Sequence, residues 1–350
     1  MRMPTMAWLR RNLFSSPVNS VTTVVLIVLM VMLAVPVVDW ALISADWIGV
    51  SRAACSGDGA CWVFVSSRLG QFVYGFYPEA ERWRADLAMA LNLGVIILLF
   101  LPDVPKRGFL IPAGLFIALF GGWLLLYGGV MGLAVVETRQ WGGMMLTLVI
   151  TIAGLFSAFP LGIALALGRR SDLPAIRAIC IVFIEFWRGI PLITVLFMAS
   201  VMLPLFLPDG ANFDKLLRAL IGVTMFAGAY LAEVARGGLQ AVPRGQYEAA
   251  AALGPSYGRT MVHVILPQAL RHVIPGIANT AIALFKDTTL VLVIGLFDFL
   301  GIIQAALTDT EWLGMALEGY VFAAAVYWVL CFTMSRASLR LERRNVGSLR

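Results

Sequence analysis

Charged side chains are scarce in this chain. Asp, Glu, Lys and Arg make up 13% of its 350 residues, against about a quarter in soluble globular proteins. Hydrophobic residues reach 60%, and the mean hydropathy is +0.88. We therefore predict an all-α, polytopic membrane protein that is surrounded by lipid.

Sequence motifs for catalysis are missing as well. The chain contains two histidines, no Cys-x-x-Cys pair, no His-Glu-x-x-His and no glycine-rich nucleotide loop. We therefore predict no enzyme activity, no metal site and no cofactor in this chain. The net charge is +6, but the basic residues fall in short clusters between apolar runs. They indicate membrane orientation rather than a nucleic-acid surface.

The apolar runs predict about eight membrane spans, since a bilayer core of about 30 Å needs about 20 helical residues. Three spans form an N-terminal extension over residues 1–138, and a five-span core follows over 139–344, with a tail at 345–350. The positive-inside rule places both termini in the cytoplasm. The predicted spans are 21–43, 86–101, 109–136, 143–168, 174–207 in two parts, 216–241, 272–304 with a break, and 319–334.

A polar, aromatic segment over residues 44–85 is predicted to lie on the outer side of the membrane. Within it, Cys55 and Cys61 flank a Gly-Asp-Gly turn. In an oxidising compartment this pair is predicted to form a disulfide, and the alternative is two reduced thiols close in sequence. Cys180 and Cys331 lie in apolar runs and are interpreted as packing residues.

A polar loop over residues 243–267 interrupts the core. Residues 247–253 predict a short helix that ends at Gly254 and Pro255. Tyr247, Ala250 and Leu253 recur at helical spacing and predict an apolar stripe that enters a partner's groove. Glu248 in the first turn is predicted to meet a cation on that partner. The alternative is a surface turn that only connects two spans.

The last long apolar run is broken by Lys286, Asp287, Thr288 and Thr289. Polar groups at membrane depth are tolerated where they line a cavity or are buried in protein, so this break is a candidate for a transport pathway. The alternative is that Lys286 and Asp287 neutralise each other as a packing pair. Two structural ion pairs are also predicted, Glu185 with Arg188 and Glu233 with Arg236.

The loop resembles the signature loop of permease subunits of ATP-binding-cassette (ABC) importers. The spacing E-A-A-x-x-x-G is filled by Glu248, Ala249, Ala250 and Gly254, and the aliphatic-x-Leu-Pro that follows is filled by residues 264–267. The stretches FWRGIP at 186–191, GAYLAEVARGGLQAVPRGQYEAA at 228–250 and FKDTTL at 285–290 resemble the polar-amino-acid branch of that family. The extension, with GFYPEAERWR at 75–84, resembles the M-type permease subunit of general L-amino acid transporters of Gram-negative bacteria.

This resemblance implies an inner-membrane subunit that takes up L-amino acids and is driven through a coupling helix. The implied partners are a dimer of ATPase subunits that binds ATP and Mg, a second related permease, a periplasmic amino-acid-binding protein, the amino acid and membrane lipid. In the family the polar break borders the translocation pathway, which implies a role there for residues 286–289 and for Ile282 and Ala283 one turn earlier. A secondary transporter is the alternative, but it requires an internal repeat that the chain lacks.

Overall fold

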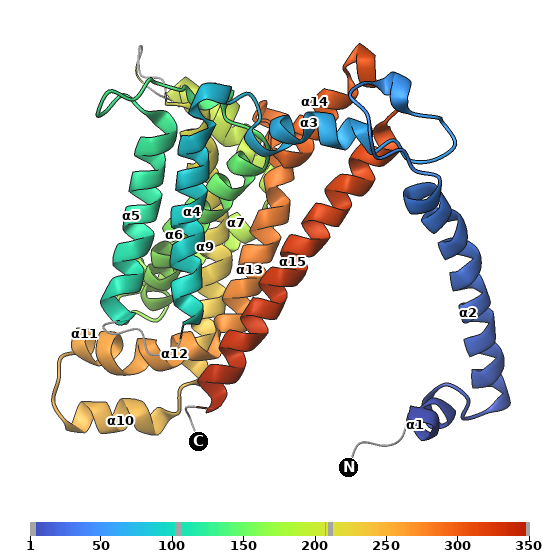
Figure 1. The fold of residues 1–350 in the computed structure, drawn as a ribbon. Helices are drawn as coiled ribbons and strands as arrows, with labels where there is room; N and C mark the ends of the chain where they lie inside the picture. Colours follow the sequence, from blue (N-terminus) through green and yellow to red (C-terminus); the bar gives the residue numbers. More distant parts are fainter. Residues whose placement is uncertain (1–4, 102–106, 207, 209–212, 348–350) are drawn as a thin grey trace. The chain divides into compact units, whose positions relative to one another are not determined.

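A computed structural model describes residues 5–101, 107–206, 208 and 213–347 (Figure 1). In this part of the chain every regular element is a helix, and β pairing is limited to three isolated bridges. Five helices are long and apolar enough to cross a membrane, and the bent pair α7 and α8 makes a sixth. The predicted all-α membrane fold is therefore confirmed. The predicted span 109–136 is shorter in the structure, because its helix ends at Tyr127 and the glycines at 128, 129 and 132 adopt positive φ.

The chain divides into two compact units. The first comprises Met1–Arg68 with Leu307–Tyr320, and the second comprises Leu69–Ala306 with Val321–Arg350. The first unit therefore combines the start of the chain with a loop from the predicted core. The domain boundary at residue 138 stays a prediction, and residues 348–350 of the predicted tail lie outside the described residues.

The first unit begins with α1 (Thr5–Asn12) and α2 (Pro17–Val38), which a π-helical turn extends to Ile43. Ser16 caps α2 by accepting a hydrogen bond from the Asn19 N–H at 3.2 Å, and Pro17 occupies the first helical position, where its missing N–H costs nothing. No side chain of α2 is buried within the chain. Within the first unit its apolar surface is therefore uncovered, as expected of a span that contacts lipid or other helices.

The second unit is a helix bundle centred on α6 (Gly143–Gly168) and α9 (Lys215–Ala241). These two helices approach closely because glycine lies at their contact. A Cβ on Gly154 would come within 2.7 Å of Val223, and one on Gly162 would come within 2.7 Å of Leu231. Such close contact between small residues is a typical way of packing membrane helices. The helices α4 (Arg82–Phe100) and α5 (Arg107–Tyr127) also belong to this unit.

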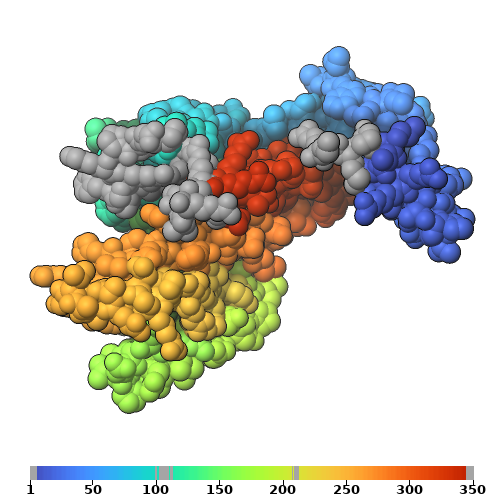
Figure 2. Space-filling view, turned by 90° about the horizontal axis from the view of Figure 1, so that it is seen from below, coloured from blue at the N-terminus to red at the C-terminus, as the bar shows by residue number. Residues whose placement is uncertain are grey.

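The predicted two-part crossing is present. Helix α7 (Pro174–Gly189) meets α8 (Leu192–Phe197) at a bend of 104°. Pro191 stands between them, and a proline cannot supply the N–H that a continuous helix needs. Between α9 and α13 (Ile274–Asp287), three short helices lie together at one end of the bundle: α10 (Arg244–Ala252), α11 (Tyr257–Thr260) and α12 (Leu266–His272) (Figure 1). Seen from below, their yellow-to-orange atoms form part of the outer surface (Figure 2).

The chain after α13 is irregular. A 3-10 helix runs from Thr288 to Ile294 and ends at Gly295, whose φ of +74° is the left-handed conformation that glycine adopts readily. Helices α14 (Phe299–Leu307) and α15 (Ala316–Gly347) follow. The polar residues 286–289 therefore mark a change from α to 3-10 geometry within one crossing, residues 274–294, and the predicted run 272–304 is interrupted after them, at Gly295.

Candidate coupling and transport site

Helix α10 has two different faces. Ala250 on its inner face is 4% exposed, and Tyr247 packs against an apolar cluster that includes Leu239, Met261 and Ile265. Four exposed residues at helical spacing form the opposite face, which we call the outer stripe: Gly245, Glu248, Ala249 and Ala252. The outer stripe therefore presents small side chains and a single carboxylate.

The predicted apolar stripe needs correction. Ala250 and Tyr247 are turned toward this chain, and of the three predicted residues only Leu253 is freely exposed, at 86%. The reason is that the short helix has to be held against the bundle, and its larger side chains serve that contact. Gly254 ends the turn after α10 with a φ of +76°, and a Cβ there would meet nothing within 4 Å.

Tyr247 is fixed by polar contacts as well as by packing. Its hydroxyl donates to the Leu239 carbonyl oxygen at 2.8 Å and accepts from Nη1 of Arg170 at 3.1 Å. The Arg170 guanidinium lies over the tyrosine ring, 5.5 Å from its centroid, in a cation–π arrangement. A cavity of about 450 Å³ opens at the same place, lined by Arg170, Leu239, Gln240, Val242, Arg244, Tyr247 and Glu248.

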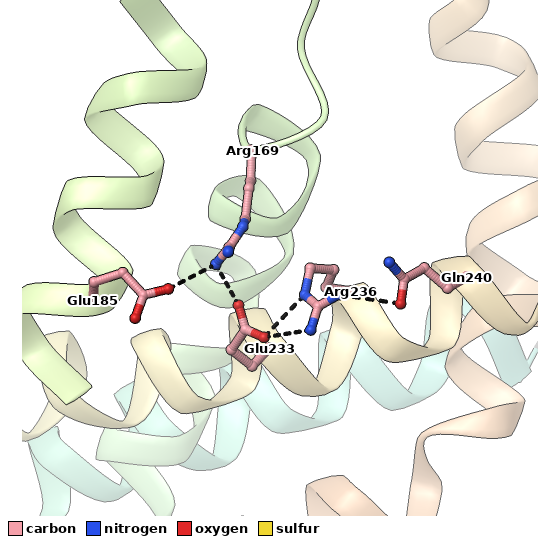
Figure 3. Close-up of polar contacts among 5 residues, drawn as sticks. All are labelled: Arg169, Glu185, Glu233, Arg236 and Gln240. Carbon is pink, nitrogen blue, oxygen red and sulfur yellow. Dashed lines mark hydrogen bonds and ion pairs between the residues drawn. The ribbon is translucent and has the colours of Figure 1, made fainter. Parts of the chain in front are cut away.

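A second polar cluster joins α6, α7 and α9 (Figure 3). Arg169, directly after α6, pairs with Glu233 on α9 at 2.6 Å and with Glu185 on α7 at 3.3 Å. Arg236 pairs with the other oxygen of Glu233 at 2.8 Å and donates to Gln240 at 3.1 Å. We call these five residues the charge cluster. Glu233 is its centre, because its carboxylate accepts from two guanidinium groups.

One predicted ion pair is present and the other is wrong. Glu233 and Arg236 pair as their spacing predicts. Glu185 instead pairs with Arg169, and the Arg188 guanidinium lies over the Tyr230 ring, 5.4 Å from its centroid. Residues three apart on a helix can pair, but a cation from another helix is in contact with Glu185 here.

The polar break at the end of α13 contains no ion pair of 4 Å or less between Lys286 and Asp287. Consecutive residues on a helix do not face each other, which explains why the packing pair does not form. Lys286 is exposed and Asp287 is half-buried. The hydroxyls of Thr288 and Thr289 donate to the carbonyl oxygens of Phe285 and Lys286, at 2.8 and 2.9 Å. One turn earlier, Ile282 is half-buried and Ala283 is exposed.

A buried junction at Asp298 was not predicted. The fully buried Asp298 carboxylate accepts from the Gly301 N–H at 2.9 Å and from the Tyr327 hydroxyl at 3.2 Å. Burial raises the pKa of Asp298 to about 6, because the charged form loses its hydration. The Phe299 N–H donates to the hydroxyl of Thr147 on α6 at 3.0 Å. The local signal was an Asp directly before an apolar run, which is typical of a helix N-cap.

The first unit contains the cysteine pair. Cys55 and Cys61 form a disulfide with their Cα atoms 5.6 Å apart. The backbone N–H of Cys61 donates to the buried Glu318 at the start of α15, at 3.3 Å. Arg68 pairs with Asp309 and also with Glu311, at 3.5 Å. The disulfide loop and residues 307–320 are therefore held together by several contacts.

This geometry first defines a class: a helical membrane protein whose core carries, between two spans, a short helix with one face left open. A family model described as "Binding-protein-dependent transport system inner membrane component" matches residues 158–346, more than half of the chain. The chain belongs to this family.

Particular relatives narrow the class. The chain is 56% identical to the "Inner membrane amino-acid ABC transporter permease protein YhdY" of Escherichia coli (strain K12), covering 98% of this chain and 94% of that protein. It is 39% identical to the "Glutamate/glutamine/aspartate/asparagine transport system permease protein BztC" of Rhodobacter capsulatus, covering 96% and 93%.

A solved structure titled "Crystal structure of an amino acid ABC transporter with histidines" aligns with a TM-score of 0.51 and 31% identity. The alignment covers 58% of this chain and 92% of that chain. This protein is therefore a permease subunit of an ABC importer and a multi-pass protein of the inner membrane, as predicted. The likeness to BztC extends through the extension, so the predicted resemblance to the M-type subunit is confirmed.

Proposed function

We propose that this subunit takes up L-amino acids from the periplasm, with a dimer of ATPase subunits docked on α10 in the cytoplasm. The full-length relatives are named as amino-acid permeases, which supports the substrate class. A second, related permease and a periplasmic amino-acid-binding protein complete the proposed importer. In this assembly ATP and Mg are bound by the ATPase, and this chain has no catalytic role and holds no cofactor.

The observation that carries the proposal is the outer stripe of α10. Glycine and alanine side chains allow a partner's backbone to approach closely, and Glu248 offers an acceptor for a basic side chain of the ATPase. Leu253, exposed at the end of the helix, adds one apolar contact. Tyr247 and Ala250 contribute indirectly, because they hold α10 against the bundle in a single orientation.

The end of α13 is the proposed border of the translocation pathway. An amino acid needs partners for an ammonium and a carboxylate, and Asp287 and Lys286 offer both charges without neutralising each other. Thr288 and Thr289 shape the break, since their hydroxyls are bonded to the helix backbone. Ile282 and Ala283 provide the apolar surface of the preceding turn.

The proposed orientation follows from the basic clusters. Arg10 and Arg11 precede the first span, and Arg169 and Arg170 follow α6. The positive-inside rule places these clusters, both termini and the coupling loop in the cytoplasm. The disulfide-bearing segment then lies in the periplasm, an oxidising compartment in which such bonds persist.

The test is to weaken ATPase docking at the outer stripe. Ala249→Arg should lower association with the ATPase by about tenfold, because a long cation replaces a methyl group at a close contact. Leu339→Arg, at an exposed position on α15, adds the same charge outside α10 and serves as the matched control. Both variants are purified from membranes and assayed for bound ATPase and ATP-driven amino-acid uptake in vesicles. Unchanged ATPase binding and uptake with Ala249→Arg would refute docking on this face, and uptake driven by an ion gradient without ATP would favour a secondary transporter.

A further inference from the structure

Arg169 and Arg170 are neighbours in the turn after α6, but they contact different parts of the molecule. Arg169 belongs to the charge cluster and pairs with Glu233 on α9 and Glu185 on α7. Arg170 donates to the hydroxyl of Tyr247 on α10 and lies over its ring. Since their consecutive Cα atoms are about 3.8 Å apart, a movement of the backbone in this turn displaces both arginines.

Few polar side-chain contacts hold α10 to the bundle. In the described parts of the chain, its hydrogen bonds to other elements come from Tyr247, to Leu239 and Arg170, and from Gln246, which accepts from Gln268 at 3.1 Å. The outer stripe makes no such bond to any residue that the structure describes. A displacement of α10 by a partner therefore reaches the bundle through few contacts: the bonds of Tyr247 and Gln246, the packing of Ala250, and the chain itself on either side of the helix.

Arg169 has two acceptors on two different helices. It holds Glu233 at 2.6 Å and Glu185 at 3.3 Å, and the Glu185 side chain is 58% exposed while that of Glu233 is 17% exposed. If Arg169 moves from Glu233 toward Glu185, Glu233 keeps its ion pair with Arg236, so neither carboxylate is left without a cation. A movement of the turn therefore changes the balance between α9 and α7, and α7 leads into the bend at Pro191.

We propose that Arg169 and Arg170 are positioning residues that transmit movement of α10 to α7 and α9. Tyr247 is the receiving side chain on α10, and Glu233 and Glu185 are the alternative acceptors in the bundle. This inference rests on the proposed function, because it needs a partner that moves α10. In this proposal the turn between α6 and α7 takes part in coupling, in addition to the coupling helix α10.

The test separates coupling from docking. Tyr247→Phe removes the hydroxyl bonded to Arg170 and Leu239 but keeps the ring and its packing. Arg170→Gln removes the cation over the ring. Arg177→Gln is the matched control, since Arg177 is exposed on α7 and its side chain has no partner among the described residues. Each variant is purified with its ATPase, reconstituted in vesicles, and assayed for amino acid taken up per ATP hydrolysed.

We expect Tyr247→Phe and Arg170→Gln to lower uptake per ATP by about fivefold, while the amount of bound ATPase stays within about twofold of wild type. The double variant should be no worse than Arg170→Gln, because both changes interrupt one link. Wild-type uptake per ATP in both single variants would overturn the inference and leave the proposed function intact. Absence of ATP-driven uptake in the wild-type complex would instead overturn the proposed function, and this inference with it.

Discussion

The two ends of α6 are held in different ways. At its start, the Gly143 N–H donates to the Phe297 carbonyl oxygen at 2.9 Å, and Thr147 accepts from the Phe299 N–H at 3.0 Å. At its end, about 39 Å away along a helix of 26 residues, the Arg169 side chain makes ion pairs with two carboxylates, on α9 and α7. The polar contacts at the first end are hydrogen bonds to backbone groups in a buried site, whereas those at the second end are ion pairs between side chains, one of them with the exposed Glu185.

This difference indicates which end can move. Buried hydrogen bonds cannot be exchanged for water without exposing the junction, so those of the backbone hold α6 against the start of α14, and that of the Tyr327 hydroxyl holds α15 at Asp298. Another segment of this unit also packs closely on this end of α6: the φ of Gly143 is +64°, and a Cβ there would lie 2.4 Å from the Phe72 carbonyl oxygen. The charge cluster can exchange partners at low cost. We therefore expect conformational change at the end of α6 that faces the coupling helix.

The largest effect is expected at the fixed end. Asp298→Ala removes the acceptor of the Gly301 N–H and the Tyr327 hydroxyl in a fully buried site, so it should destabilise the protein by about 3 kcal/mol. Asp298→Asn keeps an acceptor oxygen and should cost clearly less. Thermal unfolding in detergent measures both variants. Equal melting temperatures for Asp298→Ala and wild type would show that the hydrogen bonds of Asp298 do not stabilise this end of α6.

The buried carboxyl group of Asp298 should also make the stability of the protein depend on pH. Burial raises the pKa of Asp298 from 3.8 to about 6, so the folded protein binds this proton more tightly than the unfolded chain does. The resulting stability is complete below pH 4 and is lost as the pH rises through 6, with a limit of about 3 kcal/mol for two pKa units. Between pH 5 and pH 7.5 the melting temperature of wild type should fall, and that of Asp298→Asn should fall less. If the melting temperatures of wild type and Asp298→Asn changed identically with pH, Asp298 would not be the source of this pH dependence.

Smaller and unequal effects are expected in the charge cluster. Glu233→Gln leaves Arg169 and Arg236 without their shared, largely buried carboxylate, and should cost about 2 kcal/mol. Glu185→Gln removes a longer ion pair from an exposed side chain and should cost about 0.5 kcal/mol or less. The two substitutions are chemically matched, so thermal unfolding compares them directly. A larger loss with Glu185→Gln would mean that Arg169 is held mainly by α7.

Much of this protein follows from local sequence. A span needs only a long enough apolar run, so composition predicted the five long apolar helices and the two-part crossing at Pro191. The spacing of Glu233 and Arg236 on one helix was enough to predict their ion pair. The helix at α10 and the turn at Gly254 also depend on neighbouring residues, since helix propensity and a left-handed glycine act within a few positions.

Contacts between distant residues were decided by the tertiary structure. Glu185 pairs with Arg169 instead of Arg188, and Tyr247 and Ala250 face the bundle instead of a partner, because packing selects which side of each helix meets its neighbours. The Asp298 junction brings α6 together with α14, although Thr147 and Phe299 are 152 residues apart. Residues 307–320 likewise join the start of the chain and not the core in which they were predicted. A periodic sequence pattern shows that a helix has an apolar face. Which element packs against that face is decided by the three-dimensional structure, because residues far apart in the sequence can be neighbours in space.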